Sequence, residues 1–219
     1  SFNHFWYWRL ASSTIFCIPA SSSSSFKPFK KVSKSSISKS YILFVHSLSV
    51  KVLKYADSIS FVVAISVITG SASGMSKSAT ELLLKLGAKV YAIDIKSIDL
   101  PVENPFKADL SKKEEIDEVI SQLPEKIDSL FLCHGIAQFP GRELLVQKVN
   151  FYSQKYMTEK LLDRINEHGS VTYISSVGGF GWQQVYNKAV ELINLPTWED
   201  AMEWYDKNPE LIKSAYVFA

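Results

Sequence analysis

From about residue 60 onward, short apolar runs alternate with longer helical segments, and this rhythm is the strongest constraint on the fold. The apolar runs read FVVAISVITG, KVYAIDI, DSLFLCHG and SVTYISSVGG, and each predicts a strand. The segments KSATELLLKLGA, SKKEEIDEVISQL and LLVQKVNFYSQKYMTEKLLDRINEH predict helices, the second with Ser111 and Glu114 at capping-box spacing. Strands alternating with such helices indicate the α/β class, a doubly wound parallel sheet covered on both faces.

Residues 1–59 differ in composition from the rest of the chain. Residues 1–56 carry eight of the 24 Lys and Arg residues and no Asp or Glu, and they include a run of serines from Ser21 to Ser25. This composition suits an organelle transit peptide, a disordered tail or a stretch that is not natural coding sequence. We therefore expect residues 1–59 to lie outside the fold and residues 60–219 to form the folded domain.

The charge balance and the cysteines limit the partners of the folded part. Residues 57–219 hold the other 16 Lys and Arg residues against all 22 Asp and Glu residues, which does not favour nucleic-acid binding. No apolar run reaches the ~18–20 residues of a membrane helix, so no membrane span is expected. Cys17 and Cys133 form no metal-ligand pattern. We expect no metal and a cytoplasmic location, with organelle targeting as the alternative.

A loop rich in glycine and serine, TGSASGMS at 69–76, joins the first strand to the first helix. Glycines in such a turn let the backbone approach a pyrophosphate, and the helix N-terminus favours its negative charge. Asp94 ends the second strand, 24 residues after Gly70, where a carboxylate can bind ribose hydroxyls and repel a 2′-phosphate. The pattern indicates a dinucleotide site that prefers NAD to NADP. An ordinary loop and a solvated strand end are the alternatives.

Together these segments resemble the short-chain dehydrogenase/reductase family, whose glycine motif is T-G-x-x-x-G-x-G. Thr69, Gly70 and Gly74 match this motif, whereas Ser76 stands in place of its final glycine. The resemblance covers roughly residues 61–219 and implies a Rossmann fold that binds NAD. The residues that it assigns to the cofactor are Thr69, Gly70, Ser73, Gly74, Met75, Asp94, Asp109, Leu110, Cys133 and Gly135.

Four of these assignments rest on two short matches further along the chain. Asp109 and Leu110 correspond to the family's Asp and following apolar residue near the adenine. The sequence CHG, 133–135, stands where the family has N-A-G after its fourth strand, with His134 in place of alanine. This histidine could also indicate metal or acid–base chemistry, but no further ligands are spaced around it.

The family's catalytic tetrad is Asn, Ser, Tyr and Lys, and Asn150, Ser176 and Tyr216 match the first three. Ser176 and Tyr216 are 40 residues apart, more than in most members, and residues 180–208 predict an insertion with one or two helices. A long insertion here resembles the subgroup that includes 3α-hydroxysteroid dehydrogenase/carbonyl reductase. After it, the sequence NPE at 208–210 predicts a new helix start.

The insertion is rich in aromatic side chains, for which two interpretations are open. They could line an apolar pocket for a steroid-like or aromatic alcohol, or they could pack the insertion's own helices. The residues are Trp182, Tyr186, Trp198, Trp204 and Tyr205.

The lysine of the tetrad is expected four residues after Tyr216, at position 220, and the sequence ends at 219. We therefore expect a fragment whose sheet lacks the family's final strands and which is inactive by itself. For the whole protein the resemblance implies NAD-dependent interconversion of a secondary alcohol and a ketone, a small-molecule substrate, and a homo-oligomer as a usual assembly. The alternative is a non-catalytic protein that keeps the dinucleotide-binding half.

Overall fold

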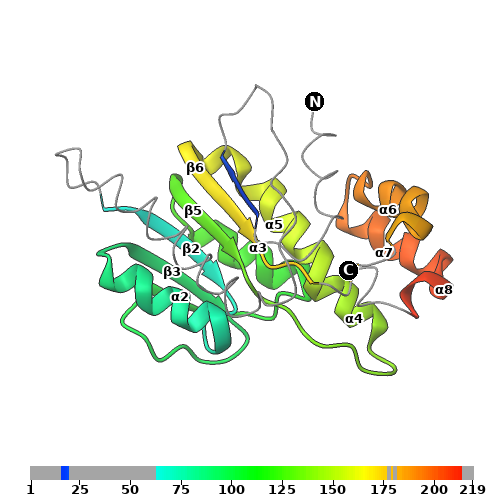
Figure 1. The fold of residues 1–219 in the computed structure, drawn as a ribbon, viewed down its shortest axis with the longest axis horizontal. Coiled ribbons are helices and arrows are strands. Elements are labelled where there is room, and N and C mark those ends of the chain that lie inside the picture. The colour runs from blue at the N-terminus through cyan, green and yellow to red at the C-terminus, as the bar shows by residue number, and fades with distance from the viewer. Residues whose placement is uncertain (1–15, 20–62, 177–178, 180–181, 214–219) are drawn as a thin grey trace, which may run out of the picture.

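The computed structural model describes residues 16–19, 63–176, 179 and 182–213, and its centre is a six-stranded sheet (Figure 1). The strand order is β1-β6-β5-β2-β3-β4. All neighbouring pairs are parallel except β1 and β6, which pair antiparallel. This arrangement confirms the α/β class and the parallel sheet. The strands are β1 (Phe16–Pro19), β2 (Ile65–Thr69), β3 (Lys89–Asp94), β4 (Asn104–Lys107), β5 (Ile127–Leu132) and β6 (Ile165–Tyr173).

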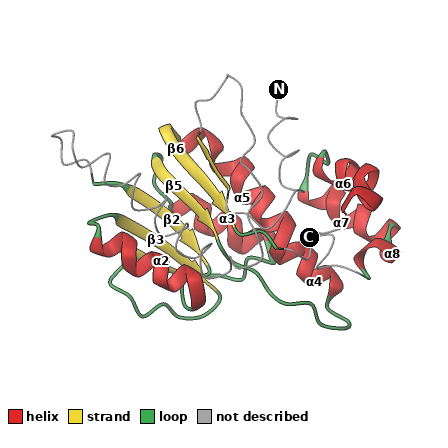
Figure 2. Ribbon diagram, viewed as in Figure 1, coloured by secondary structure: helices red, strands yellow, loops and turns green. Residues whose placement is uncertain are grey.

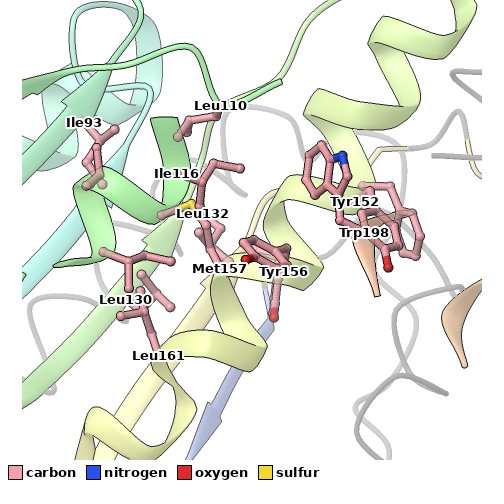
Figure 3. Close-up of a cluster of buried hydrophobic side chains, with 14 of the residues drawn as sticks. Ile93, Leu110, Ile116, Leu130, Leu132, Tyr152, Tyr156, Met157, Leu161 and Trp198 are labelled. Carbon is pink, nitrogen blue, oxygen red and sulfur yellow. The ribbon is translucent and has the colours of Figure 1, made fainter. Parts of the chain in front are cut away.

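Helices cover both faces of the sheet, as the doubly wound arrangement requires (Figure 2). On one face, α2 (Gly74–Lys85) packs Ala79 and Leu83 against strand residues such as Ile68. On the other face, α3 (Lys113–Gln122) and α5 (Ser153–Leu161) bury a larger cluster with the sheet (Figure 3). Each fully buried aliphatic side chain stabilises the fold by about 1.5–3 kcal/mol.

The order of the strands reverses between β2 and β5. From β2 the chain moves outward to β3 and β4, and then it crosses back to β5 and β6. Thr69 at the end of β2 pairs with Leu132 at the end of β5, so the two turns that follow lie next to each other. Open α/β sheets bind ligands beyond the carboxyl ends of the strands at such a reversal.

The long helix predicted after β5 is divided and ends earlier than expected. It consists of α4 (Glu143–Gln147), a π-helical turn η2 (Lys148–Tyr152), α5 and a 3-10 turn η3 (Leu162–Arg164). Ile165, which continues the four-residue spacing of Leu161, already begins β6. The strand then bulges at His168 (φ 67°) and Gly169, where a Cβ would lie 2.6 Å from Ile165 Cγ2. The glycine is therefore required by the bulge.

β4 was not expected from the sequence, and its position in the sheet explains how it tolerates a proline. The strand contains Pro105, which has no N–H to donate and is tolerated where one side of a strand has no neighbour. β4 is the last strand of the sheet on that side within the described residues, so the missing donor costs no ladder bond.

The insertion forms the expected helices and packs against α5. It comprises η5 (Trp182–Val185), α6 (Tyr186–Ile193) and α7 (Trp198–Lys207), and α8 (Pro209–Ile212) follows it. The ring of Trp198 meets Tyr152 and Tyr156 edge-on, with centroids 5.3 and 5.6 Å apart (Figure 3). Such aromatic pairs stabilise by roughly 0.5–1.5 kcal/mol beyond their buried area. The helix start predicted at NPE is confirmed by α8, which begins at Pro209.

Four residues of the N-terminal segment belong to the sheet, against the expectation that residues 1–59 lie outside the fold. β1 pairs Phe16 with Tyr173 and Pro19 with Ser170 along β6. β6 contacts β5 on its other side, and an antiparallel neighbour satisfies backbone groups that an edge strand would expose. The remaining residues of 1–59 lie outside the described residues, and for them the expectation stays a prediction. Among the described residues no helix is long and apolar enough to cross a membrane.

Candidate functional site

The glycine turn after β2 contains two residues with positive φ that serve different purposes. Gly70 (φ 78°) donates its N–H to Ile93 O at 2.8 Å, and a Cβ on it would lie 3.0 Å from His134 Cα. Gly74 (φ 60°) begins α2, and apart from its chain neighbours and the nearby backbone of its own helix, no described atom lies within 4 Å of the place of a Cβ. Gly70 therefore permits close packing of two turns, whereas Gly74 leaves an open cradle at the helix start.

Ser76 replaces the final glycine of the motif without disturbing the turn. Its side chain is 4% exposed, and its Oγ donates to Thr69 O at 2.7 Å. The hydroxyl thereby ties the first turn of α2 to the end of β2. Next to it, Ser73 and Met75 are exposed at the start of α2, where no described side chain caps the helix. The backbone N–H groups at this uncapped start of α2 face the open cradle and suit an anion.

Asp94 fastens the glycine turn to the end of β3. Asp94 is 8% exposed. Its Oδ2 accepts from Ala72 N at 2.9 Å, and its Oδ1 accepts from Lys96 N at 2.8 Å. A carboxylate offers about four lone-pair sites, so each oxygen keeps capacity for a further donor. The position fits a group with vicinal hydroxyls and opposes an added phosphate.

Asp109 and Leu110 follow β4 at the same carboxyl edge. Asp109 Oδ1 accepts from Ser111 N at 3.0 Å and from Ser111 Oγ at 2.7 Å, and Leu110 is buried in the core. The predicted capping pair of Ser111 and Glu114 is wrong, because Glu115 reaches back instead and accepts from Asp109 N at 2.6 Å. That bond, aided by Lys112, holds the pKa of the Glu115 carboxyl below its ordinary value.

The turn after β5 is held by side chains from the helix behind it. Asn150 Oδ1 accepts from Ile136 N at 2.8 Å, and Asn150 Nδ2 donates to Ile136 O at 2.9 Å. Gln154 Nε2 donates to His134 O at 2.9 Å. Asn150 lies within the π-helical turn η2, a feature that often marks functional positions in helices. The predicted residues Cys133, Gly135 and Asn150 are thus brought together.

His134 contacts both flanking elements through its ring. Nδ1 lies 2.7 Å from Thr69 Oγ1 and Nε2 lies 2.8 Å from Ser153 Oγ. Thr69 Oγ1 also accepts from the backbone N–H groups of Cys133 at 3.0 Å and His134 at 3.3 Å. The described residues contain no group of three or more His, Cys, Asp or Glu side chains that could hold a metal.

The structure describes Asn150 and Ser176 of the three predicted catalytic residues. Ser176 lies three residues beyond the end of β6, at the same edge of the sheet as the two turns, and Gly179 N donates to its carbonyl at 3.3 Å. Tyr216 lies outside the described residues. The structure therefore gathers the glycine turn, Asp94, the Cys133–Ile136 turn, Asn150 and Ser176 at one edge.

Comparison with known proteins agrees with this geometry. The chain is 37% identical over 154 residues to a coniferyl-alcohol dehydrogenase of Pseudomonas sp. (strain HR199 / DSM 7063), covering 69% of this chain and 59% of that protein. This similarity confirms the resemblance to the short-chain dehydrogenases/reductases. It is also 30% identical over 125 residues to an NAD-dependent glycerol dehydrogenase of Listeria innocua, which covers 52% of this chain and 46% of that one. The chain thus spans about half of the length of these relatives.

A solved structure gives the same fold. The crystal structure of a 3-alpha-hydroxysteroid dehydrogenase from Pseudomonas sp. B-0831, complexed with NADH, superposes with a TM-score of 0.56 at 23% identity. The match covers 71% of this chain and 61% of that one, and it shows a shared fold. No family model matches the chain.

The sequence patterns did not indicate the polar side chains that support the second turn. Ser153 and Gln154 are 0% and 2% exposed, on the face of the helix that meets His134. The available signal was their spacing, since they follow Asn150 by three and four residues and share its helix face. Alone, this signal does not distinguish them from solvated helix residues.

Proposed function

We propose that the chain forms the dinucleotide-binding part of an NAD-dependent oxidoreductase that interconverts an alcohol and a carbonyl compound, a secondary alcohol and a ketone in the family's usual reaction. The observation that carries the proposal is the meeting of two turns at the strand reversal, with the open cradle of Gly74 beside Asp94. The names of the relatives agree, since two are alcohol-type dehydrogenases and one solved structure holds NADH.

The cofactor residues are assigned by the motif, and the geometry of the turns supports this assignment. The turn around Gly70, Ser73, Gly74 and Met75 would hold the pyrophosphate through backbone N–H groups at the start of α2. Asp94 would accept from the adenosine ribose, which favours NAD over NADP. The other proposed contacts are Thr69, Asp109, Leu110, Cys133 and Gly135.

The chemical step is assigned by motif to Asn150, Ser176 and Tyr216. When bound, the nicotinamide supplies the hydride acceptor or donor. Tyr216 would exchange a proton with the substrate oxygen, Ser176 would hold that oxygen by a hydrogen bond, and Asn150 would support a water relay. The tetrad lysine is expected at position 220 in the whole protein, where its ammonium would favour the phenolate.

The tyrosines nearest Asn150 along the helix do not suit the acid–base role. Burial raises the pKa of the Tyr152 and Tyr156 hydroxyls above the ordinary tyrosine value, with charged Glu159 adding for Tyr152 and the bond to Asp117 adding for Tyr156. Tyr152 donates to Thr197 O at 2.6 Å and Tyr156 to Asp117 Oδ1 at 2.6 Å. Both hydroxyls are therefore kept protonated and committed to structural bonds, which supports the assignment of the role to Tyr216 by motif.

The aromatic insertion divides into a packed part and a remaining pair. Trp198, Trp204 and Tyr205 are 6%, 5% and 1% exposed, which supports the interpretation that they pack the insertion. Trp182 and Tyr186 are only partly buried, with ring centroids 5.7 Å apart. A steroid-like or aromatic alcohol would meet this pair, and such a substrate agrees with the coniferyl alcohol and hydroxysteroid in the relatives' names.

A homo-oligomer would have to use a surface other than one face of α5. Trp198 lies against Tyr152 and Tyr156, and the buried Lys155 Nζ donates to Leu195 O at 3.2 Å, so the insertion covers this face. We place no nucleic acid or membrane among the partners.

The test compares two cofactors and two charge-neutralising variants in the full-length protein. NADH binding is followed by energy transfer from tryptophan, and turnover of alcohols by absorbance at the NADH band. We expect kcat/KM to be higher with NAD than with NADP. Asp94→Asn should raise the KM for NAD about tenfold and reduce the ratio of kcat/KM with NAD to kcat/KM with NADP. Asp99→Asn, in the exposed loop that follows β3, serves as the control and should change neither quantity.

The outcomes separate the alternatives. NADH binding without turnover of any hydroxysteroid, aromatic alcohol or glycerol would favour the non-catalytic dinucleotide-binding protein. A preference for NADP would contradict the assigned role of Asp94.

A further inference from the structure

The His134 ring connects the two turns of the site in a way that the proposed reaction does not use. The family usually has alanine at this position, which has no side-chain hydrogen bonds to offer. Here Nδ1 and Nε2 both lie within hydrogen-bond distance of hydroxyls, Thr69 Oγ1 at 2.7 Å and Ser153 Oγ at 2.8 Å. These hydroxyls belong to β2 and α5, so the ring joins the sheet to the helix that follows the Asn150 turn.

The donors and acceptors around Thr69 decide the direction of its bond to the ring. A hydroxyl has two lone pairs and one proton. The N–H groups of Cys133 and His134 donate to Thr69 Oγ1, at 3.0 and 3.3 Å, and fill both lone pairs. The proton can then go to His134 Nδ1 at 2.7 Å or to Phe131 O at 3.2 Å, and the shorter contact favours the ring nitrogen.

The other end of the bridge agrees with this direction. Ser153 Oγ donates its single proton to Val149 O at 2.9 Å, so towards the ring it acts as an acceptor. Nε2 must then carry the hydrogen. One consistent set results, in which Thr69 donates to Nδ1, Nε2–H donates to Ser153, and Ser153 donates to Val149. The imidazole is neutral in this set, because Nδ1 accepts.

The chain of bonds ends inside the π-helical turn that carries Asn150. The N–H of Ser153 donates to Lys148 O, five residues back, while its hydroxyl donates to Val149 O, four residues back. Ser153 thus supports both carbonyls that precede Asn150 in this wide turn. The bond from His134 fixes the Ser153 hydroxyl in the orientation that this requires.

We propose that His134 is a positioning residue whose neutral imidazole, protonated at Nε2, holds the π-helical turn of Asn150 in place against Thr69. Its effect on catalysis rests on the proposed function, whereas the tautomer and the coupling to Ser153 do not. Loss of the ring leaves Thr69 held by two backbone N–H groups and Gly70 held by Ile93 O. The glycine turn therefore keeps its shape, whereas the π-helical turn that carries Asn150 loses its hydrogen-bonded link to the His134 ring.

The first test reads the tautomer directly in the full-length protein. Long-range ¹H–¹⁵N correlation spectra at neutral pH identify which ring nitrogen carries hydrogen, and the His134→Leu spectrum assigns the signal. We expect the neutral Nε2–H tautomer. A neutral Nδ1–H tautomer or an imidazolium would overturn the proposal.

The second test asks whether hydrogen bonding, and not volume, is what matters. His134→Leu keeps much of the volume but makes no hydrogen bond, and we expect kcat to fall about tenfold while the NADH dissociation constant changes less than about twofold. The matched control is His168→Asn, at an exposed positive-φ position of the β6 bulge that asparagine tolerates. It should change neither. A His134→Leu protein with unchanged kcat would overturn the proposal.

A double-mutant cycle separates this inference from the proposed function. Ser153→Ala and His134→Leu should each lower Tm by a few degrees, and the double variant should fall little further, because both remove the same bridge. Full additivity of the two shifts would overturn the coupling. If the full-length protein neither binds NADH nor turns over alcohols, the proposed function fails, but the tautomer and this cycle still decide the role of His134.

Discussion

The two turns at the strand reversal are built by different means. The turn after β2 has positive φ at Gly70 and Gly74, and its side-chain hydroxyls bond locally, Ser71 Oγ to Ile68 O at 3.0 Å and Ser76 Oγ to Thr69 O at 2.7 Å. Its backbone N–H groups are also tied to Ile93 and Asp94 at the end of β3. The turn after β5, residues 133–136, contains no positive-φ residue and is held from outside, by Thr69, Asn150 and Gln154.

This difference separates local from tertiary control of a binding edge. A turn that requires left-handed backbone conformation can be recognised in the sequence by its glycines, and the side-chain hydroxyls that support it lie within a few residues. A turn in ordinary backbone conformation takes its shape from whatever side chains reach it, here from residues 14 to 65 positions away along the chain. Substitutions at and around the two turns test this contrast.

Gly70→Ala should be the most destabilising change at either turn. The left-handed φ costs about 1–2 kcal/mol for a residue with a Cβ, and the 3.0 Å approach to His134 Cα adds about 1–3 kcal/mol of overpacking. Gly74→Ala, with positive φ but open space, is the matched control and should lose only the first contribution. Urea unfolding of the full-length protein measures both, and equal losses would refute the close approach.

Asn150→Ala should destabilise the second turn by about 1–3 kcal/mol, because Ile136 N–H and C=O both lose their partner. Amide hydrogen exchange at Ile136 should accelerate, while the amide of Gly70 stays protected. Asn187→Ala, on the exposed side of α6, is the control and should leave both unchanged. Faster exchange at Gly70 would mean that the two turns are not separately supported.

Ser76→Ala should cost about 0.5–1.5 kcal/mol, since one buried hydrogen bond to Thr69 O is lost. Ser76→Gly, which restores the family's motif, should cost about 1 kcal/mol more because glycine destabilises a helix. The exposed Ser78→Ala of the same helix provides the control in thermal unfolding. If the glycine variant were more stable than wild type, the serine would be a strain and not a support.

The smallest expected effect concerns pH and the start of α3. Because the bond from Asp109 N–H lowers the pKa of the Glu115 carboxyl in the folded state, this carboxylate stabilises the fold above its ordinary pKa near 4.5 and ceases to do so as pH falls through the lowered value. Glu115→Gln should therefore flatten the acid limb of a Tm–pH curve between about pH 5 and 3. Glu118→Gln, exposed on the same helix, should leave the limb as steep as in wild type.

Sequence patterns predicted the fold class and the first turn well because their causes are local. Alternating apolar runs and helical segments place strands and helices without knowledge of the tertiary structure. The backbone conformation of the turn explains the glycines at 70 and 74, and the end of the second predicted strand explains the position of Asp94. The same logic failed where a pattern was ambiguous, as at Ile165, whose helical spacing continues into β6.

The sequence patterns therefore predicted the alternation of strands and helices, the parallel sheet and the glycine turn. The tertiary structure was needed to show that β1 pairs with β6, that Glu115 and not Glu114 reaches back to Asp109, and that the His134 ring joins Thr69 to Ser153. The physical reason is that a hydrogen bond between distant segments depends on the position of both, and these positions are fixed by the packing of α5 on the sheet. A histidine between a cysteine and a glycine has no preferred partner until that packing provides two hydroxyls.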